Sequence, residues 1–281
     1  MVKFDSGLSG CRLNLVGKNS IKKTCISKKY YPRLKKQAIK HKEFSCLSIN
    51  GIKTPKIKNI LSAGYVMEYI PYQNIHESSI LYDRYKINKI SENLINLIDY
   101  EIDQSNFYGE AEARRLIQKK LKDIYIKSDH KNFIKFLMKI DIDYSKIPKS
   151  ICHGDLTSTN LIFDGKNIFL IDFLDSYIEN YLIDLSKIKQ DFYYFWASLI
   201  SNKKNKKYYQ SHLAIWKPIE YKYKKILNSK SFKFFDAINL LRIEPYLTFN
   251  YKKNILSSII KDLDIFKSYE KFNYSNGRKI F

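Results

Sequence analysis

The sequence predicts an α+β fold with two lobes, in which a small β-rich lobe precedes a large helical lobe. The first 70 residues contain short strand-like segments bounded by turn-forming residues, which is typical of an antiparallel sheet. From residue 73 onwards, apolar residues recur every three or four positions, which is the helical period. Two short apolar runs flank a turn sequence near residue 165 and indicate a β-hairpin within the helical part. We therefore expect one lobe over residues 1–70 and the other over residues 71–281.

Length and composition limit the class of protein. A chain of 281 residues can bury a large core. Its longest apolar run, residues 192–200, is far shorter than the roughly 18 residues of a membrane helix, and the N-terminus lacks the apolar region of a signal peptide. The cysteines show neither a C-x-x-C pair nor metal-ligand spacing; they are Cys11, Cys25, Cys46 and Cys152. We expect a reduced, cytoplasmic protein without a membrane span.

The net charge of +22 is concentrated at the two ends of the chain. Residues 1–75 contain 15 Lys and Arg against 3 Asp and Glu, residues 76–200 contain 17 against 19, and residues 201–281 contain 18 against 6. Lysine outnumbers arginine 43 to 7, whereas readout of bases and phosphates favours arginine. Such an excess affects solubility and nonspecific attraction, so we expect no specific nucleic-acid partner.

The chain begins with a predicted pair of strands. Residues 12–16 alternate in polarity, residues 21–26 form the second strand, and residues 17–19 form the turn between them. Gly7 and Gly10 precede the first strand in another short turn. A glycine-containing turn of this kind can bring backbone N–H groups close to phosphate groups.

A helix and two further strands complete the β-rich lobe. The helix is expected to begin near Pro32, a favoured first-turn residue, and to extend to about Leu47 with Leu34 on its apolar face. Residues 55–60 and 64–70 have the character of strands, and a proline follows the second of them.

The remainder is predicted to be helical on both sides of the hairpin. Before the hairpin, the helical period is carried by Ile87, Ile90, Leu94, Leu97, Phe133, Phe136 and Leu137. After it, one amphipathic helix is expected from the stripe of Leu185, Ile188, Phe192, Phe195 and Leu199. We expect the aromatic residues near this stripe to pack in the core rather than to form a cage for a quaternary amine.

The candidate chemistry lies in and before the hairpin. His153, Asp155 and Asn160 have the spacing H-x-D-x-x-x-x-N, and Asp172 ends the second apolar run. If residues 164–167 form the turn, Asn160 and Asp172 become neighbours at the open end of the hairpin. Their amide and carboxylate oxygens are ligands that Mg²⁺ prefers, and Asp155 stays free to act on a nucleophile.

These residues and their context resemble a known family. The sequence HGDLTSTN at residues 153–160, followed by IDF at residues 171–173, is similar to the catalytic and metal-binding loops of the aminoglycoside phosphotransferase and choline kinase family. That family has a protein-kinase-like fold, and the resemblance extends over about residues 1–75 and 150–190. It implies an enzyme that uses ATP and Mg²⁺.

The resemblance implies a role for each motif residue. Asp155 accepts or orients the proton of the acceptor hydroxyl. Asn160 and Asp172 hold the metal ion, and His153 fixes the catalytic loop. Asp184, on the helix that follows, is expected to brace that loop through hydrogen bonds.

In the β-rich lobe the resemblance implies contacts with the phosphates of ATP. Gly7 and Gly10 are expected to lie over the phosphates, and Lys23 to position the α- and β-phosphates. Lys22 is the alternative, because a slip of one residue exchanges the two faces of a strand.

The resemblance also predicts the surroundings of that lysine and of the adenine base. The acidic partner that the lysine normally finds on the next helix stays open between Glu43, which lies about 180° from the apolar face, and Gln37, which lies on the better face but is uncharged. Met67 is expected to border the adenine pocket. The backbone groups of Glu68 and Ile70 are expected to hydrogen-bond the base.

Together these features predict an ATP-dependent phosphotransferase with a small hydroxylated acceptor. The excess of Lys and Arg in residues 201–281 repels a polycation. We therefore expect a neutral or anionic acceptor, a sugar or sugar derivative of cell-surface polysaccharide assembly, where similar bacterial phosphotransferases occur, with Asp175 near it. A choline, amino-alcohol or aminoglycoside kinase and a nucleotide-binding pseudokinase are the alternatives. The oligomeric state and the preference between ATP and GTP stay open.

Overall fold

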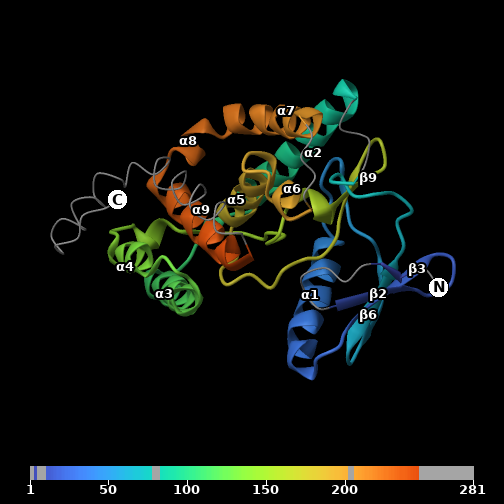
Figure 1. Cartoon of the computed structure of the whole chain (residues 1–281), viewed down its shortest axis with the longest axis horizontal. Helices are drawn as coiled ribbons and strands as arrows, with labels where there is room; N and C mark the ends of the chain where they lie inside the picture. The colour runs from blue at the N-terminus through green and yellow to red at the C-terminus, as the bar shows by residue number, and fades with distance from the viewer. Residues whose placement is uncertain (1–2, 5–10, 78–82, 202–205, 247–281) are drawn as a thin grey trace.

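The fold is seen in a computed structural model, which describes residues 3–4, 11–77, 83–201 and 206–246. A β-sheet with one helix packed on it forms the N-terminal part, and a group of helices forms the rest (Figure 1). This arrangement confirms the predicted α+β class.

The N-terminal sheet has five antiparallel strands. In spatial order they are β1 (Lys3–Phe4), β2 (Cys11–Leu15), β3 (Ser20–Cys25), β6 (Gly64–Glu68) and β5 (Ile57–Leu61). In β3 buried and partly exposed residues alternate, so that Ile21, Lys23 and Cys25 share the buried face. Lys22 consequently lies on the opposite face.

Helix α1 (Tyr31–Phe44) packs on this sheet and connects the two cores. It begins with Pro32 in its first turn, and it ends three residues earlier than the sequence predicted. Leu34 and Ala38 belong to the small core beneath the sheet, whereas Phe44 belongs to the large core of the helical part. The position of α1 is therefore fixed by both lobes.

The predicted hairpin is present and forms two of the three strands of a second sheet. Its order is β4 (Ile52–Lys53), β10 (Ile168–Leu170) and β9 (Leu161–Phe163), with β4 parallel to β10. The Asp164 carboxylate accepts hydrogen bonds from two backbone N–H groups of the turn, and Gly165 adopts a φ of 101°. Ile168 pairs with Phe163 as predicted, which fixes the register of the residues at the open end.

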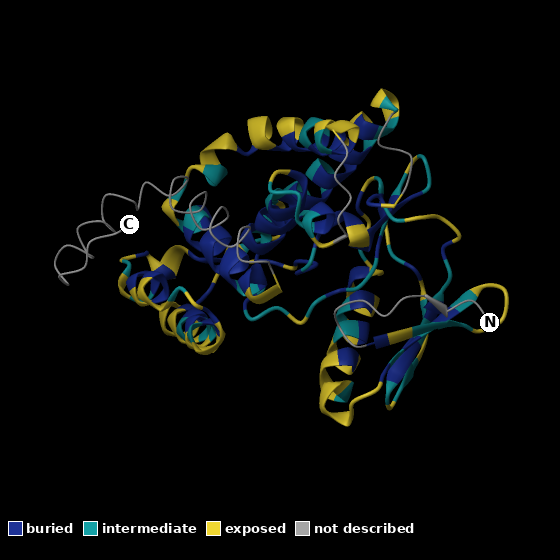
Figure 2. Ribbon diagram, in the orientation of Figure 1, coloured by how far each residue is buried: buried dark blue, intermediate teal, exposed yellow. Residues whose placement is uncertain are grey.

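Eight α-helices are described outside the masked ranges besides α1, and α5 is the central one. They are α2 (Arg84–Asp103), α3 (Glu110–Lys127), α4 (Lys131–Lys139), α5 (Tyr181–Phe192), α6 (Trp196–Ser201), α7 (Lys206–Lys222), α8 (Lys224–Leu227) and α9 (Lys230–Ile243). Helix α5 packs against α2, α7 and α9 and is buried almost all round (Figure 2). In the part of the chain that the structure describes, no helix combines the length and the apolar character needed to span a membrane.

Short elements connect these helices to the site. A strand pair, β7 (Asn106–Phe107) with β8 (Pro148–Lys149), closes the insertion that contains α3 and α4. Turns of 3₁₀-helix occur at Lys28–Tyr30, Tyr144–Lys146, Ser158–Asn160 and Glu244–Tyr246.

One predicted helix is interrupted. The stripe from Leu185 to Leu199 was expected on a single helix, but α5 ends at Phe192 and α6 starts at Trp196. Phe195 between them has a φ of 60°, which no helical residue adopts. The buried Asp191 carboxylate accepts a hydrogen bond from the backbone N–H of Ala197 at 2.8 Å, and this bond holds the reversed chain in place.

Candidate active site

The loop that carries Asp155 is held from below by helix α5. The Asp184 carboxylate accepts hydrogen bonds from the backbone N–H groups of His153 and of Gly154, the latter at 2.6 Å. Gly154 has a φ of +87°, and a Cβ there would lie 2.2 Å from Ser176 Oγ. The loop therefore requires glycine at this position, and Asp184 braces it as the resemblance implied.

A second buried carboxyl group supports Asp184. Glu101 of α2 is fully buried beside it. Burial and the negative charge of Asp184 raise the pKa of Glu101 well above its ordinary value. Burial likewise raises the pKa of Asp184 to about 6. Burial therefore disfavours the charged form of both carboxyl groups.

Asp155 lies between a lysine and an amide. Lys187 Nζ of α5 is 3.2 Å from Asp155 Oδ1, and Asn160 Nδ2 donates to Asp155 Oδ2 at 3.1 Å. Burial raises the pKa of Asp155, but the positive charge of Lys187 and its hydrogen bond outweigh burial and leave the pKa lowered. The side chain keeps 36% of its surface exposed. Asp155 is therefore an ionised carboxylate that a hydroxyl group can reach.

His153 holds the loop and does not face the open side of the site. Its Nε2 lies 2.7 Å from the carbonyl oxygen of Ile171, and its Nδ1 accepts from the backbone N–H of Asp155 at 3.2 Å. The ring packs on Phe173 with 4.4 Å between centroids. Burial lowers the pKa of His153 to about 4, so the ring is neutral and Nε2 carries the proton that it donates to Ile171.

Asn160 and Asp172 meet at the open end of the hairpin. The backbone N–H of Ile171 donates to the Asn160 carbonyl at 3.1 Å, which makes Asp172 the next residue along. Asp172 adopts a φ of 60°, a left-handed conformation that Asp tolerates better than most residues. The predicted neighbourhood of these two side chains is therefore present.

The donor set fits a hard divalent cation. Asn160 Nδ2 is directed at Asp155, and among the described residues no hydrogen bond or ion pair engages the amide oxygen of Asn160 or the second carboxylate oxygen of Asp172. No group of three or more His, Cys, Asp or Glu in the described ranges could hold a metal on its own. One amide and one carboxylate oxygen match the way Mg²⁺ binds beside substrate phosphates and water.

Lys23 reaches this centre from the N-terminal sheet. Its Nζ lies 2.7 Å from Asp172 Oδ1, and only 4% of its side chain is exposed. Burial disfavours the charged form, but the charge of Asp172 and the neighbouring Tyr65 outweigh it, so the pKa of Lys23 is raised. Of the two alternatives, Lys23 rather than Lys22 is therefore directed at the centre.

The acidic partner expected from α1 is not bonded to Lys23. Glu43 is exposed, Gln37 is half-buried, and neither is hydrogen-bonded to Lys23 in the described structure. Helix α1 is instead tied to the segment after Asp172 by Lys40, which donates to the Leu174 carbonyl at 2.9 Å and pairs with Glu179 at 2.6 Å. In the ion pair that fixes α1, the helix therefore supplies the lysine, whereas the expected pair needed an acidic residue on this helix.

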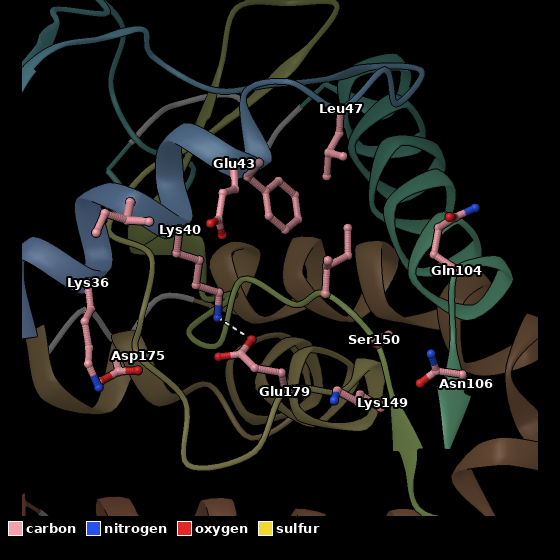
Figure 3. Close-up of a pocket in the computed structure, with 13 residues that line it drawn as sticks. Lys36, Lys40, Glu43, Leu47, Gln104, Asn106, Lys149, Ser150, Asp175 and Glu179 are labelled. Atoms are coloured by element: carbon pink, nitrogen blue, oxygen red, sulfur yellow. Dashed lines mark hydrogen bonds and ion pairs between the residues drawn. The ribbon is translucent and has the colours of Figure 1, made fainter. Parts of the chain in front are cut away.

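A cavity of about 590 Å³ lies between α1, the end of α2 and the segment after Asp172 (Figure 3). Lys40 and Glu179 point toward one another across it, and Lys36 pairs with Asp175 at one end with 3.4 Å between Nζ and Oδ2. Asp175, which the resemblance placed near the acceptor, therefore lies beside α1. The cavity is separate from the centre, because the motif residues do not line it.

Two of the residues predicted to contact adenine, Met67 and Glu68, already contact other parts of the protein. Met67 is buried in the small core, and the backbone N–H of Glu68 donates to the Lys56 carbonyl at 2.9 Å. The N–H of Ile70 has no partner among the described residues, which leaves it available. Gly7 and Gly10 lie outside the described residues.

Comparisons with known proteins agree with this geometry. Residues 92–216 match the profile of the phosphotransferase enzyme family. Over these residues the chain is similar to that family, and its fold as a whole is kinase-like. The predicted resemblance is thereby confirmed. No curated protein matches the chain in sequence.

Solved structures similar to this chain share its fold at low sequence identity. Aminoglycoside phosphotransferase APH(4)-Ia, in a ternary complex with ADP and hygromycin B, is 10% identical with a TM-score of 0.63, and 93% of each chain is covered. The streptomycin–ATP complex of APH(2")-IIa is 15% identical with a TM-score of 0.53, covering 89% of this chain and 86% of that one. Choline kinase from Cryptosporidium parvum Iowa II is 14% identical with a TM-score of 0.51, covering 98% and 90%.

Several charged residues of the candidate site were not predicted. Lys187 pairs with Asp155, Lys40 holds the segment after Asp172, and Glu101 lies beside Asp184. No signal in the sequence marks these three residues, since lysine and glutamate are common on helices.

Proposed function

We propose that the chain transfers the γ-phosphoryl group of ATP, in the presence of Mg²⁺, to a hydroxyl group of a small acceptor. The observation that carries this proposal is the convergence of Lys23, Asp155, Asn160 and Asp172 from two sheets and one loop onto a single centre. The family match and the nucleotide-bound structures of similar fold support it. Phosphoryl transfer asks a protein mainly for positioning and charge neutralisation, which these side chains supply.

Asp155 acts on the acceptor hydroxyl. The hydroxyl oxygen forms a bond to the γ-phosphorus as the bond between that phosphorus and the oxygen bridging to the β-phosphate breaks, and ADP leaves. The proton of the hydroxyl passes to Asp155, which Lys187 at 3.2 Å keeps ionised beforehand. His153 and Asp184 contribute by fixing the position of the loop.

The other residues bind the phosphates. Asn160 and Asp172 would hold Mg²⁺, which neutralises phosphate charge and orients the transferred group when bound. Lys23, now paired with Asp172, is placed to neutralise the α- and β-phosphates. The free N–H of Ile70 is the backbone group of this strand end that would hydrogen-bond adenine.

The acceptor that we propose is a sugar or sugar derivative of cell-surface polysaccharide assembly. The basic composition of the C-terminal part disfavours a polycation. The test is a coupled assay of ADP release with sugars, sugar phosphates, choline and aminoglycosides as acceptors. We expect turnover with a sugar or a sugar phosphate. Turnover confined to choline or to aminoglycosides would overturn the acceptor, and ATP hydrolysis or binding without transfer to any acceptor would overturn the kinase assignment.

A further inference from the structure

Two cations from distant helices contact one tyrosine in the segment that follows Asp172. Lys120 Nζ of α3 and Arg242 Cζ of α9 each lie 5.7 Å from the centroid of the Tyr177 ring. Tyr177 belongs to the segment that connects Asp172 to α5. Its hydroxyl group is buried and has no hydrogen-bond partner among the described residues. These three residues, the Tyr177 cluster, thus adjoin the proposed transfer centre, by which we mean Lys23, Asp155, Asn160 and Asp172.

The cations of the Tyr177 cluster have no acidic partner in the described part of the chain. No carboxylate forms an ion pair with Lys120 or with Arg242, and Arg242 donates to the neutral side chain of Asn239 at 3.0 Å. Both cations are partly buried. Two partly buried positive charges held near each other without an anion are electrostatically unfavourable.

This repulsion lowers the pKa of Lys120. Burial and then the charge of Arg242 lower the pKa of Lys120 to about 8, and Asp123 on the same helix offsets this only in part. Lys127 and Arg33 of α1 add to the repulsion, so positive charge surrounds Lys120 from three helices. An anion bound here would relieve a repulsion that the free protein retains.

The Tyr177 cluster lies within electrostatic range of the proposed base. The charge of Arg242 acts on both Asp155 and Lys187. An acceptor whose hydroxyl group meets Asp155 can therefore direct another of its groups toward Arg242 and Lys120. Arginine and lysine side chains bind phosphate and carboxylate groups through charge-assisted hydrogen bonds.

We infer that Lys120, Arg242 and Tyr177 form an anion-binding site for the acceptor, so that the acceptor carries a phosphate or carboxylate group besides the hydroxyl that is phosphorylated. The inference rests on the proposed function, which it narrows from neutral or anionic acceptors to anionic ones. It also separates this chain from the similar structures whose complexes contain streptomycin or hygromycin B.

The chain contains a matched control for this site. Lys131 and Lys135 of α4 lie over the ring of Tyr125 at 5.6 and 5.8 Å, which repeats the arrangement of two cations on one tyrosine. Both of these lysines are exposed on the surface, in contrast to Lys120 and Arg242. Solvent stabilises their charges, so removing one of them should not affect an acceptor.

The test compares acceptors that share one sugar and differ in whether they carry a phosphate, a carboxylate or no charged group. Matched trios of a sugar, its phosphate ester and its uronic acid are assayed for ADP release with the wild type, Lys120→Gln, Arg242→Gln and the control Lys131→Gln. We expect an anionic member to be preferred, and its KM to rise about tenfold to hundredfold in the first two variants, the effect of losing one charge-assisted hydrogen bond. The kcat, the KM for ATP and the control variant should change little. The preferred member distinguishes phosphate from carboxylate.

The results separate the inference from the proposed function. Turnover that favours the neutral sugar, or a KM for the anionic acceptor that is the same in Lys120→Gln and Lys131→Gln, would overturn the inference and leave the kinase standing. If no acceptor is phosphorylated, the proposed function fails, and calorimetric titration with a sugar phosphate without nucleotide tests the site alone. Binding that weakens in Lys120→Gln and Arg242→Gln but not in Lys131→Gln then supports the anion site, and equal binding by all of them overturns it. Thermal unfolding of each variant checks that it is folded.

Discussion

The transfer centre and the Tyr177 cluster handle charge in opposite ways. In the transfer centre, Lys23 pairs with Asp172 at 2.7 Å and Lys187 pairs with Asp155 at 3.2 Å. In the Tyr177 cluster, which lies only a short segment away, no described carboxylate forms an ion pair with either cation. Paired charges keep the centre ordered before any ligand arrives, whereas unpaired charges favour a ligand that supplies the missing sign.

Substitution of the proposed base should have the largest effect. Asp155→Asn keeps the shape and the contact with Asn160 but cannot take up the proton, so turnover should fall about 10²- to 10⁴-fold. Binding of Mg-ATP, measured by calorimetry, should be nearly unchanged. Glu110→Gln, which affects an exposed pair with Arg114, is the control and should leave turnover intact. Equal losses in both variants would mean that the role of Asp155 is misassigned.

The lysine behind the base should come next. Lys187→Met removes the charge next to Asp155 while filling a similar volume, and we expect kcat to fall about 10²-fold because a preorganised charge is lost. The KM for ATP should not change. Lys189→Met on the same helix removes the pair with Asp236 at 2.8 Å instead, so it serves as the control. An unchanged kcat in Lys187→Met would remove this residue from the mechanism.

A smaller effect is expected from the glycine of the catalytic loop. Gly154→Ala forces a Cβ onto Ser176 Oγ at a left-handed φ and should lower the free energy of unfolding by about 1 to 3 kcal/mol. Gly165→Ala, at a φ of +101° with nothing near its Cβ, isolates the contribution of φ alone. Urea unfolding measures both. If Gly154→Ala loses no more free energy of unfolding than Gly165→Ala, the loop around Gly154 adjusts to accommodate the added Cβ.

The pH dependence of acceptor binding should be the mildest effect. The pKa of Lys120 is about 8 in the free protein, below the ordinary value, so Lys120 loses its charge as the pH rises through 8. Above pH 8, binding an anion requires uptake of a proton, and the KM of an anionic acceptor should rise by up to about tenfold per pH unit. Lys120→Arg stays charged throughout and should lose this step in the pH profile. A wild-type profile that is flat between pH 7 and 9 would contradict the assignment.

Local sequence signals predicted most of the fold and the part of the site that the motif residues form. The strands, α1 and the hairpin follow from alternation, turn residues and a first-turn proline, and the register placed Asn160 beside Asp172 correctly. The choice between Lys22 and Lys23 could not be made from the sequence, because it depends on which face of β3 meets α1.

The rest depended on contacts between distant segments. Lys187 reaches Asp155 because α5 packs under the catalytic loop, and Lys120 meets Arg242 because α3 and α9 lie on the same side of Tyr177. Neither relation leaves a periodic pattern in the sequence. The break at Phe195 was missed for a related reason, since its apolar side chain continues the helical stripe while its backbone reverses.

The most direct test of the account is the effect of Mg-ATP on thermal unfolding of the wild type and of Asp172→Asn. Asparagine tolerates the left-handed φ of Asp172, so the variant removes a carboxylate and keeps the backbone. At about 100 times the dissociation constant, a ligand stabilises a protein by about 2.7 kcal/mol, or several degrees in Tm for a chain of this length. The account predicts this rise in the wild type and the loss of most of it in Asp172→Asn, each measured against its own ligand-free Tm. A folded wild type that shows no shift, or an equal shift in both proteins, would contradict it.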